Sequence, residues 1–504
     1  MEDKLQSFRA AVYGCVNYAK DAFMDLVDAL SSFETKSVVE LSLSPHFKRR
    51  HHSIPRAIHD CTSGRNGHGN QVLDFTNCLI RHSTLNDDTK CRSMALDETP
   101  RPTPYSLKLP KRIVHQATPT PGQKPIAIGQ SISVLGEPRE NGSWFLPYSA
   151  ERVPSDQSAV LFGLEQVEKI SSHLTDKVNI ISADFKYSTA AAVSRSWSWD
   201  NDVLLARLSP TRVFYHPYHY TPDDIKKRGR PSIYGETFRL RENTETKPDV
   251  EVRLEHHTSK GELWKVSVAR FDNLLIKADA KNKLQNKPVS IFRISIQDES
   301  GSFLYKEPLW LIGSGKPAKI ISLKDVFHSY NKRFSIEHWF RFSKQKLLFD
   351  SFQTCNIEHS DNWLYLPVLA THMLYHSRYL ASAEHRPWEK PSKNSTPAQV
   401  KRGMSAVLDK IGSPTQPPKL RGIGLGRIPG SQNQVARETL PIEYKASSTN
   451  LAEGKIIIKV ASDSLQDQDD IQINVRKLPA CGRELKRALK QLLETGQATL
   501  DRVA

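Results

Sequence analysis

The chain has 504 residues and a mass of 57.1 kDa, too long for one compact core, so we expect about two to four domains. Apolar residues make up 38% of the sequence and charged residues 25%, which excludes a mainly disordered or collagen-like protein. The 71 Lys and Arg outnumber the 55 Asp and Glu by 16, with a sequence pI near 9.4. This excess favours a polyanionic partner, nucleic acid first and an acidic membrane surface second. No apolar run approaches the roughly 20 residues of a membrane-spanning helix.

Residues 1–90 are predicted to be helical and then loop-like, and to bind DNA. Charges interrupt the apolar residues of the first 30 positions every few residues, which is typical of an amphipathic helix and not of a signal peptide. Six scattered cysteines without a CxxC pair indicate a reduced, cytoplasmic protein. The basic run KRRHH at 48–52 fits a solvated surface and a contact to a DNA backbone equally well.

From residue 91 the pattern changes to short strand-like runs separated by Pro and Gly. These runs lie at 91–97, 125–136, 142–153, 177–184 and 202–215, with a helical pattern at 161–174. The sequence therefore predicts an α/β fold, a mixed sheet flanked by helices, whose first part spans 91–215.

The remaining segments differ in character. Residues 216–320 alternate as strands and predict an inserted antiparallel β domain, and helices return at 322–350 and 360–383, so that 321–383 forms the second part of the core. Residues 384–445 are basic and rich in Pro and Gly, with nine Lys or Arg against two acids between positions 386 and 427. Residues 446–504 form a tail that is strand-like and then helix-like.

Two of the predicted strands end on an aspartate. SMALD ends on Asp97 and NIISAD on Asp184. The carboxyl ends of strands are where sites form in open α/β sheets, although an aspartate is also a common first residue of a turn.

A third acid lies in the predicted helix SYNKRFSIEHWFRFSKQKLLF. Tyr330, Arg333, Glu337 and Lys344 are separated by 3, 4 and 7 positions, and at roughly 100° per residue they project within a sector of about 60°. One face would then carry a carboxylate, two cations and a phenol. The plainer alternative is an amphipathic helix with an ion pair between Arg333 and Glu337.

These four residues match the signature Y-x2-R-x3-E-x6-K, and in this the chain resembles the cut-and-paste DDE transposases of the insertion sequence 4 kind. LDETPRPTP around Asp97 and ADFKYSTAA around Asp184 look like the two aspartate blocks of such enzymes. GRPSIYG at 229–235 looks like a segment common in related transposases. The resemblance runs from about 91 to 350 and implies an RNase H-like catalytic core with a β-rich insertion.

The resemblance also implies a chemistry. Asp97, Asp184 and Glu337 would hold two Mg²⁺ or Mn²⁺ ions, which stabilise the attacking and leaving oxygens of phosphodiester transfer. Arg333 and Lys344 would compensate phosphate charge, and Tyr330 would contact a phosphate or a displaced base. Trp264 and Trp310 are candidates for holding a flipped base, with core packing the favoured interpretation of both.

The leading hypothesis is a transposase that cleaves DNA at transposon ends and joins them to target DNA. Its partners would be the terminal inverted repeats and target DNA, bound by a dimer in the synaptic complex, and its location the nucleoid in the cytoplasm, as for a bacterial-type mobile element. The alternatives are a catalytically silent, transposase-derived DNA-binding protein and another RNase H-like nuclease.

Overall fold

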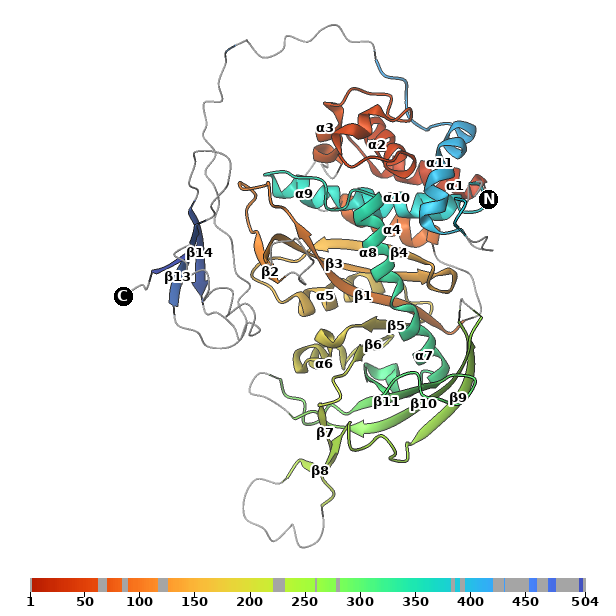
Figure 1. The fold of residues 1–504 in the computed structure, drawn as a ribbon, viewed down its shortest axis with the longest axis vertical. Helices are drawn as coiled ribbons and strands as arrows, with labels where there is room; N and C mark the ends of the chain where they lie inside the picture. Colours follow the sequence, from red (N-terminus) through yellow and green to blue (C-terminus); the bar gives the residue numbers. More distant parts are fainter. Residues whose placement is uncertain are drawn as a thin grey trace.

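The computed structural model describes residues 2–61, 70–83, 89–116, 126–220, 232–258, 261–277, 282–381, 386–389, 395–419 and 430, and the backbone of three strands within 453–501. A ten-stranded mixed sheet lies at the centre, and helices cover both of its faces (Figure 1). Along the sheet the strand order is β2-β3-β1-β5-β6-β12-β11-β10-β9, and β4 pairs with β3.

The first half of the sheet contains β1 (Cys91–Pro102), β3 (Ile126–Arg139), β4 (Trp144–Arg152), β5 (Val178–Ala183) and β6 (Asp202–Arg207). β3 is antiparallel to β1 and to β4, whereas β5 is parallel to β1 and to β6. A short strand, β2 (Ile113–Gln116), adds to β3 at the edge. The mixed sheet predicted from the sequence is confirmed, and its arrangement is consistent with an RNase H-like fold.

The second half of the sheet is antiparallel and comes from the segment expected to form an inserted β domain. It contains β9 (Val250–His257), β10 (Leu263–Leu274), β11 (Val289–Gln297) and β12 (Leu309–Ser314). β12 pairs with β6 through Leu311 and Arg207, so these strands continue the central sheet directly.

The predicted strand at 202–215 is two strands. β7 (Val213–Pro217) leaves the main sheet and pairs with β8 (Tyr234–Arg239). Between β6 and β7 the chain turns at Ser209, whose carbonyl accepts from the Arg212 amide at 3.0 Å. Pro210 in this turn has no amide proton to continue a ladder.

Helices on the two faces of β1 can be assigned from the alternation of its side chains. On one face, Leu96 lies against Gly163 of α5 (Ala159–Ser171), which is followed by α6 (Ala190–Ser196). On the other face, the Ser93 hydroxyl lies 2.7 Å from that of Ser329 in α7 (Leu323–Lys332). Asp97 is four residues after Ser93 and therefore faces α7 and the helix that follows it, α8 (Ser335–Lys346).

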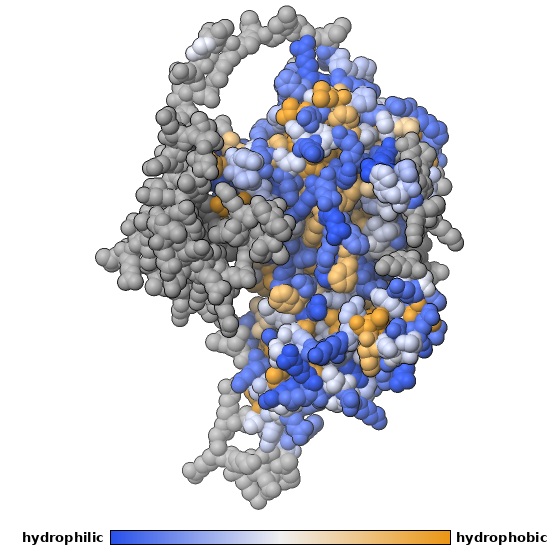
Figure 2. All heavy atoms as spheres, viewed as in Figure 1, coloured by the Kyte–Doolittle hydropathy of each residue, from blue (hydrophilic) through white to orange (hydrophobic). Residues whose placement is uncertain are grey.

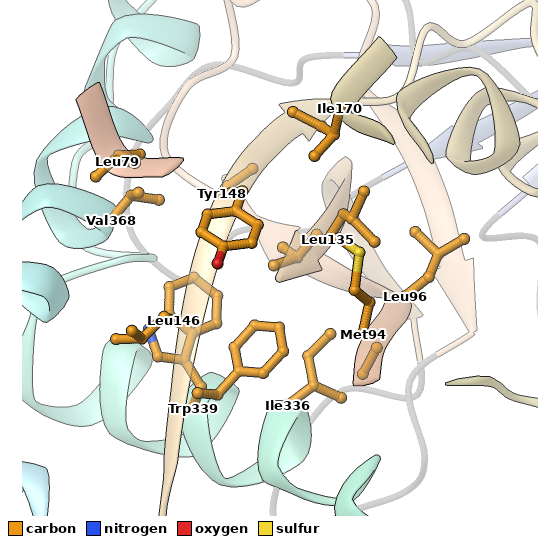
Figure 3. Packing of buried hydrophobic residues seen from close by; sticks show 14 of the residues in the cluster. Leu79, Met94, Leu96, Leu135, Leu146, Tyr148, Ile170, Ile336, Trp339 and Val368 are labelled. Atoms are coloured by element: carbon orange, nitrogen blue, oxygen red, sulfur yellow. The ribbon is translucent and has the colours of Figure 1, made fainter. Parts of the chain in front are cut away.

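The single helix expected over 322–350 is broken between α7 and α8. At the break the amides of Arg333, Ile336 and Glu337 each donate to the carbonyl three residues earlier, which tightens the turn relative to an α-helix. α8 packs on the sheet through the buried Ile336, which points toward Met94 of β1, and Trp339, which lies by Leu146 of β4 (Figure 3).

A helical layer covers the sheet above α8 (Figure 1). Its members are α1 (Glu2–Cys15), α2 (Lys20–Ser32), α3 (Ser53–Asp60), α4 (Asn70–Ser83), α9 (Ile357–Trp363), α10 (Tyr365–Ser377) and α11 (Pro397–Ile411). Short 3-10 turns lie at η1 (Val39–Leu43), η2 (Glu140–Gly142), η3 (Phe185–Ser188) and η5 (Lys316–Lys319). Helices α1 and α2 agree with the expected helical start of residues 1–90, whereas α3 and α4 lie in the later part, which was expected to be loop-like. The role of this region in DNA binding stays a prediction.

α11 lies in the segment expected to be only basic and irregular. The Thr396 hydroxyl accepts from the Gln399 amide, and the Gln399 side chain accepts from the Thr396 amide, which makes a capping box with Pro397 at the first turn. Val400, Met404, Val407 and Leu408 are buried. The TPAQ capping pattern followed by this helical spacing is the signal that identifies the helix in the sequence.

The tail forms a separate sheet of β13 (Glu453–Lys459), β14 (Asp470–Arg476) and β15 (Ala498–Asp501). Residues 477–497, which include the predicted tail helix, lie outside the described residues.

Candidate active site

The two predicted aspartates lie at the same level on or beside neighbouring parallel strands. Asp184 directly follows β5, as predicted. Asp97 instead lies inside β1, which continues to Pro102 and pairs Asp97 with Val134 of β3, so the prediction that this strand ends on Asp97 is wrong. Leu96 of β1 lies opposite Ala183 of β5, so the next residues, Asp97 and Asp184, are neighbours across this pair of strands. Asp184 ends β5 and begins η3, where its carbonyl accepts from the Tyr187 amide at 3.0 Å. The parallel pairing thus brings together two acids that are 87 positions apart in the sequence (184 − 97).

Arg333 connects Asp97 to the third acid. Its side chain is 5% exposed, and it places Nη2 at 3.1 Å from Glu337 Oε1 and Nη1 at 3.9 Å from Asp97 Oδ2. The i,i+4 ion pair expected as the plainer alternative is therefore present, but it is also part of a larger cluster. Because Arg333 lies at the break between α7 and α8, it reaches the sheet while Glu337 remains on α8 with its side chain 48% exposed.

Lys186 is a second cation at Asp97, and it is not among the predicted site residues. Its Nζ lies 3.2 Å from Asp97 Oδ1 and 3.4 Å from Glu98 Oε2. The same Asp97 oxygen accepts from the Glu98 amide at 2.8 Å. Lys186 stands two residues after Asp184. Its place in the site could therefore be predicted from the sequence only through the expectation that Asp97 and Asp184 are neighbours.

Two buried tyrosines lie near these acids, on opposite faces of the sheet: Tyr330 belongs to α7, and the Tyr187 hydroxyl lies beside Gly163 and Leu96 on the other face. Tyr330 is 4% exposed, and burial raises the pKa of its phenol, with Arg333 opposing the rise and the negative charge of Asp184 adding to it. Burial, followed by the charges of Asp97 and Glu98, raises the pKa of Tyr187 well above its usual value. Both phenols stay protonated at neutral pH and are placed as core side chains in this arrangement.

Lys344, predicted to contact phosphate, bonds to the end of β1. Its Nζ donates to the Pro100 carbonyl at 2.7 Å and lies 3.5 Å from Asp350 Oδ2. Burial raises the pKa of Asp350, and the neighbouring Lys344 partly opposes this rise.

Arg101 fixes the segment that follows α8 against the sheet. It is fully buried, and it donates to the carbonyls of Phe349, Phe352 and Ser360 at 3.2, 2.9 and 3.1 Å. It lies on β1 four residues after Asp97, so one strand carries both the acid and the anchor of the helix that presents Glu337.

Other predicted residues lie elsewhere. Trp310 is buried and packs against Phe238 and Phe271, as the core-packing interpretation expects, and Trp264 packs against His256. Of the GRPSIYG segment, residues 229–231 lie outside the described residues, and Tyr234 and Gly235 begin β8.

The three acids offer the hard oxygen ligands that Mg²⁺ prefers. No set of three or more His, Cys, Asp or Glu side chains in the described part of the chain is gathered closely enough to hold a metal ion. Arg333 and Lys186 instead lie at the oxygens of Asp97. The backbone positions and the donor chemistry thus fit a divalent-ion site, provided that these two cations move away from Asp97.

Where the residues are described, charged and polar side chains cover most of the face that Figure 2 shows. Among the described residues, no helix is both long and apolar enough to cross a bilayer.

A family model described as DDE superfamily endonuclease matches residues 11–269. This match spans 259 of the 504 residues, just over half of the chain (269 − 11 + 1 = 259). It includes Asp97 and Asp184 and ends within β10, before Glu337. No curated protein matches the sequence significantly. The mixed sheet, the neighbouring aspartates on β1 and after β5, and this match agree, and the chain belongs to the DDE superfamily endonuclease family.

Proposed function

We propose that the protein is a DDE transposase of the insertion sequence 4 kind, which cleaves DNA at the ends of a mobile element and transfers those ends into target DNA. The observation that carries this proposal is the arrangement of the three acids. Asp97 and Asp184 are neighbours across the β1–β5 pair, and Arg333 joins Asp97 to Glu337. The Y-x2-R-x3-E-x6-K signature supports the finer assignment.

In this proposal the three carboxylates hold two Mg²⁺ or Mn²⁺ ions, which when bound stabilise the attacking and leaving oxygens of the reaction. The acids are fixed by the β1–β5 pairing and by Arg101, so little reorganisation of the backbone is needed. Arg333 and Lys186 leave the carboxylates for the phosphate oxygens of the DNA. The planar fork of Arg333 suits two oxygens of one phosphate, whereas Lys186 acts as a point charge.

The reaction has two steps. Water attacks the phosphorus at a transposon end, a P–O bond forms, and the P–O bond to the 3′ oxygen breaks. The freed 3′ hydroxyl then attacks a phosphorus of target DNA and displaces the target's own 3′ oxygen. Synapsis of two ends implies at least a dimer on DNA.

The test is cleavage of a DNA that carries the element's own ends, with Mg²⁺ or Mn²⁺, by the wild type, Asp97→Ala and a matched control, Glu242→Gln. Glu242 is an exposed acid paired with Arg239. We expect no detectable end cleavage by Asp97→Ala, an unchanged circular dichroism spectrum, and wild-type cleavage by Glu242→Gln.

Other outcomes separate the alternatives. Retained cleavage by Asp97→Ala would overturn the site. Binding of the ends without cleavage by the wild type would indicate the catalytically silent relative, and cleavage of RNA–DNA hybrids alone would indicate another RNase H-like nuclease.

A further inference from the structure

Two basic segments far apart in the sequence meet at one hollow in the helical layer. The hollow has a volume of about 950 Å³. One wall is the start of α2 together with the 48–53 segment and the first turn of α3, and the other is the chain at 416–419, which follows α11. Figure 1 shows this chain, in blue, leaving α11 beside α2.

Arg49 joins the two walls. It pairs with Asp25 of α2, and its Nη2 donates to the Gln416 carbonyl at 2.6 Å. Asp21 accepts from the Gln416 amide at 3.0 Å. Arg49 and these two aspartates are therefore occupied with one another, and they fix the position of the 416–419 segment.

The other cations of the hollow remain available. Lys48, Arg50 and Lys419 are exposed and form no ion pair within the described residues. Arg56 is 72% exposed and pairs with Asp60 at its own i,i+4 position. Five Lys or Arg line the hollow against a single acid, Asp21. Like charges held together in this way repel one another, and a bound polyanion offsets that repulsion.

We infer that this hollow binds the phosphate backbone of duplex DNA, as a second contact separate from the carboxylate cluster. This inference rests on the proposed function, which makes DNA the substrate. The available cations come from both walls of the hollow and not from one loop, so they suit a ligand with several phosphates. Contacts of this kind position DNA without reading its sequence. The basic run at 48–52 is thus assigned to DNA contact and not to a merely solvated surface.

The test measures how binding to a 30-base-pair duplex of arbitrary sequence depends on salt. Fluorescence anisotropy is recorded on the full chain in EDTA, so that cleavage does not intervene. The hollow variant is Lys48→Ala, Arg50→Ala and Lys419→Ala. The control variant is Lys247→Ala, Lys283→Ala and Lys306→Ala. These three lysines are exposed in the β-rich segment, and their substitution removes the same amount of charge.

Each phosphate contact contributes roughly 0.9 to the slope of log K against log salt, so we expect the hollow variant to lower the slope by about 2 to 3. Its affinity at low salt should fall about tenfold or more, whereas the control should keep the wild-type slope. Because Lys48, Arg50 and Lys419 form no ion pair within the described part of the chain, the hollow variant should have the same melting temperature as the wild type.

Equal losses in both variants, or none in the hollow variant, would overturn the inference. Tighter binding of an RNA duplex that is lost in the hollow variant would overturn DNA as the partner. A wild type that binds no duplex would also overturn it, whereas the proposed function is judged separately by end cleavage.

Discussion

At the scale of residues, the charge of Asp97 is balanced by two cations from distant parts of the chain. Its carboxylate is 16% exposed and faces Arg333 on one oxygen and Lys186 on the other. A carboxylate that has lost much of its water needs such partners. The same oxygens would bind a divalent ion, so the internal cations and the ion compete for one place.

We predict that Lys186→Met strengthens the response to divalent ions. With Lys186 absent, the ion no longer displaces a cation from Asp97, so the Mg²⁺ concentration at half-maximal thermal stabilisation should fall about threefold to tenfold. Without the ion, the variant should lose about 1 kcal/mol of stability at most.

The measurement is thermal melting across a Mg²⁺ titration, with Lys169→Met as control. Lys169 pairs with Glu151 at 3.9 Å on the outside of the protein. An unchanged midpoint in Lys186→Met would contradict the competition between Lys186 and the ion.

At the scale of elements, the position of α8 depends on Arg101. We predict that Arg101→Met lowers the free energy of unfolding by about 3 kcal/mol or more, because it leaves three buried carbonyls without a donor. Burial lowers the pKa of Arg101 to about 10, so the wild-type side chain is still charged at neutral pH. Urea unfolding at pH 7 measures the loss. Arg101→Lys keeps the positive charge but not the planar guanidinium, so its free energy of unfolding should lie between those of Arg101→Met and the wild type. A loss below 1 kcal/mol would exclude this anchoring role.

α10 carries a histidine whose neutral form holds three elements together. His372 Nε2 donates to the Pro147 carbonyl of β4 at 2.9 Å, and its Nδ1 lies 2.8 Å from the Ser83 hydroxyl of α4. Only the neutral ring accepts from Ser83 while donating to Pro147. Burial lowers the pKa of His372 to about 3.

We predict that this histidine makes the fold acid-sensitive. The unfolded chain binds a proton below pH 6.5 and the folded chain does not until about pH 3. The contribution of His372 to stability is therefore complete above pH 6.5 and is lost as the pH falls toward 3. Between pH 7 and pH 5 the loss is about 2 kcal/mol.

Urea unfolding at both pH values checks this prediction. His372→Gln should be less stable at pH 7 but should lose about 2 kcal/mol less than the wild type on acidification. His219→Gln, at an exposed position, should keep the wild-type pH dependence. Equal pH dependence of His372→Gln and the wild type would contradict the prediction.

At the scale of the whole molecule, the central sheet and the helical layer depend on distant parts of the chain. β12 attaches β9–β11 to β6, and α11 packs against α2 and α10. The buried Lys401 of α11 donates to the carbonyls of Leu30 and Phe33.

We predict that residues 1–419 fold like the whole chain and that 1–395 do not. The longer fragment keeps α11 and the Arg49–Gln416 bond, so its melting temperature should lie within about 3 °C of the full chain. The shorter one loses four buried apolar side chains of α11, at about 1.5 to 3 kcal/mol each, and should melt much earlier or be insoluble. Melting of both purified fragments measures this, and equal stability of the two would contradict it.

The sequence by itself determined the features that follow from local periodicity. Alternating and helical patterns predicted the strands of the core, the helical N-terminal region and the acids at Asp97 and Asp184, because side chains repeat every 2 or 3.6 residues whatever the rest of the chain does. The signature residues also predicted that Arg333 and Glu337 lie together. The catalytic roles of these residues stay predictions.

Only the tertiary structure decided which distant residues meet. The parallel pairing of β1 and β5 places Lys186 at Asp97, the pairing of β6 and β12 joins the antiparallel strands to the core, and the docking of α11 builds the basic hollow. Such contacts depend on loop closure and on packing between segments hundreds of residues apart. No local pattern encodes them. The sequence places a large part of the net charge of +16 between positions 386 and 427, and only the structure brings Lys419 of that segment to the basic run at 48–52.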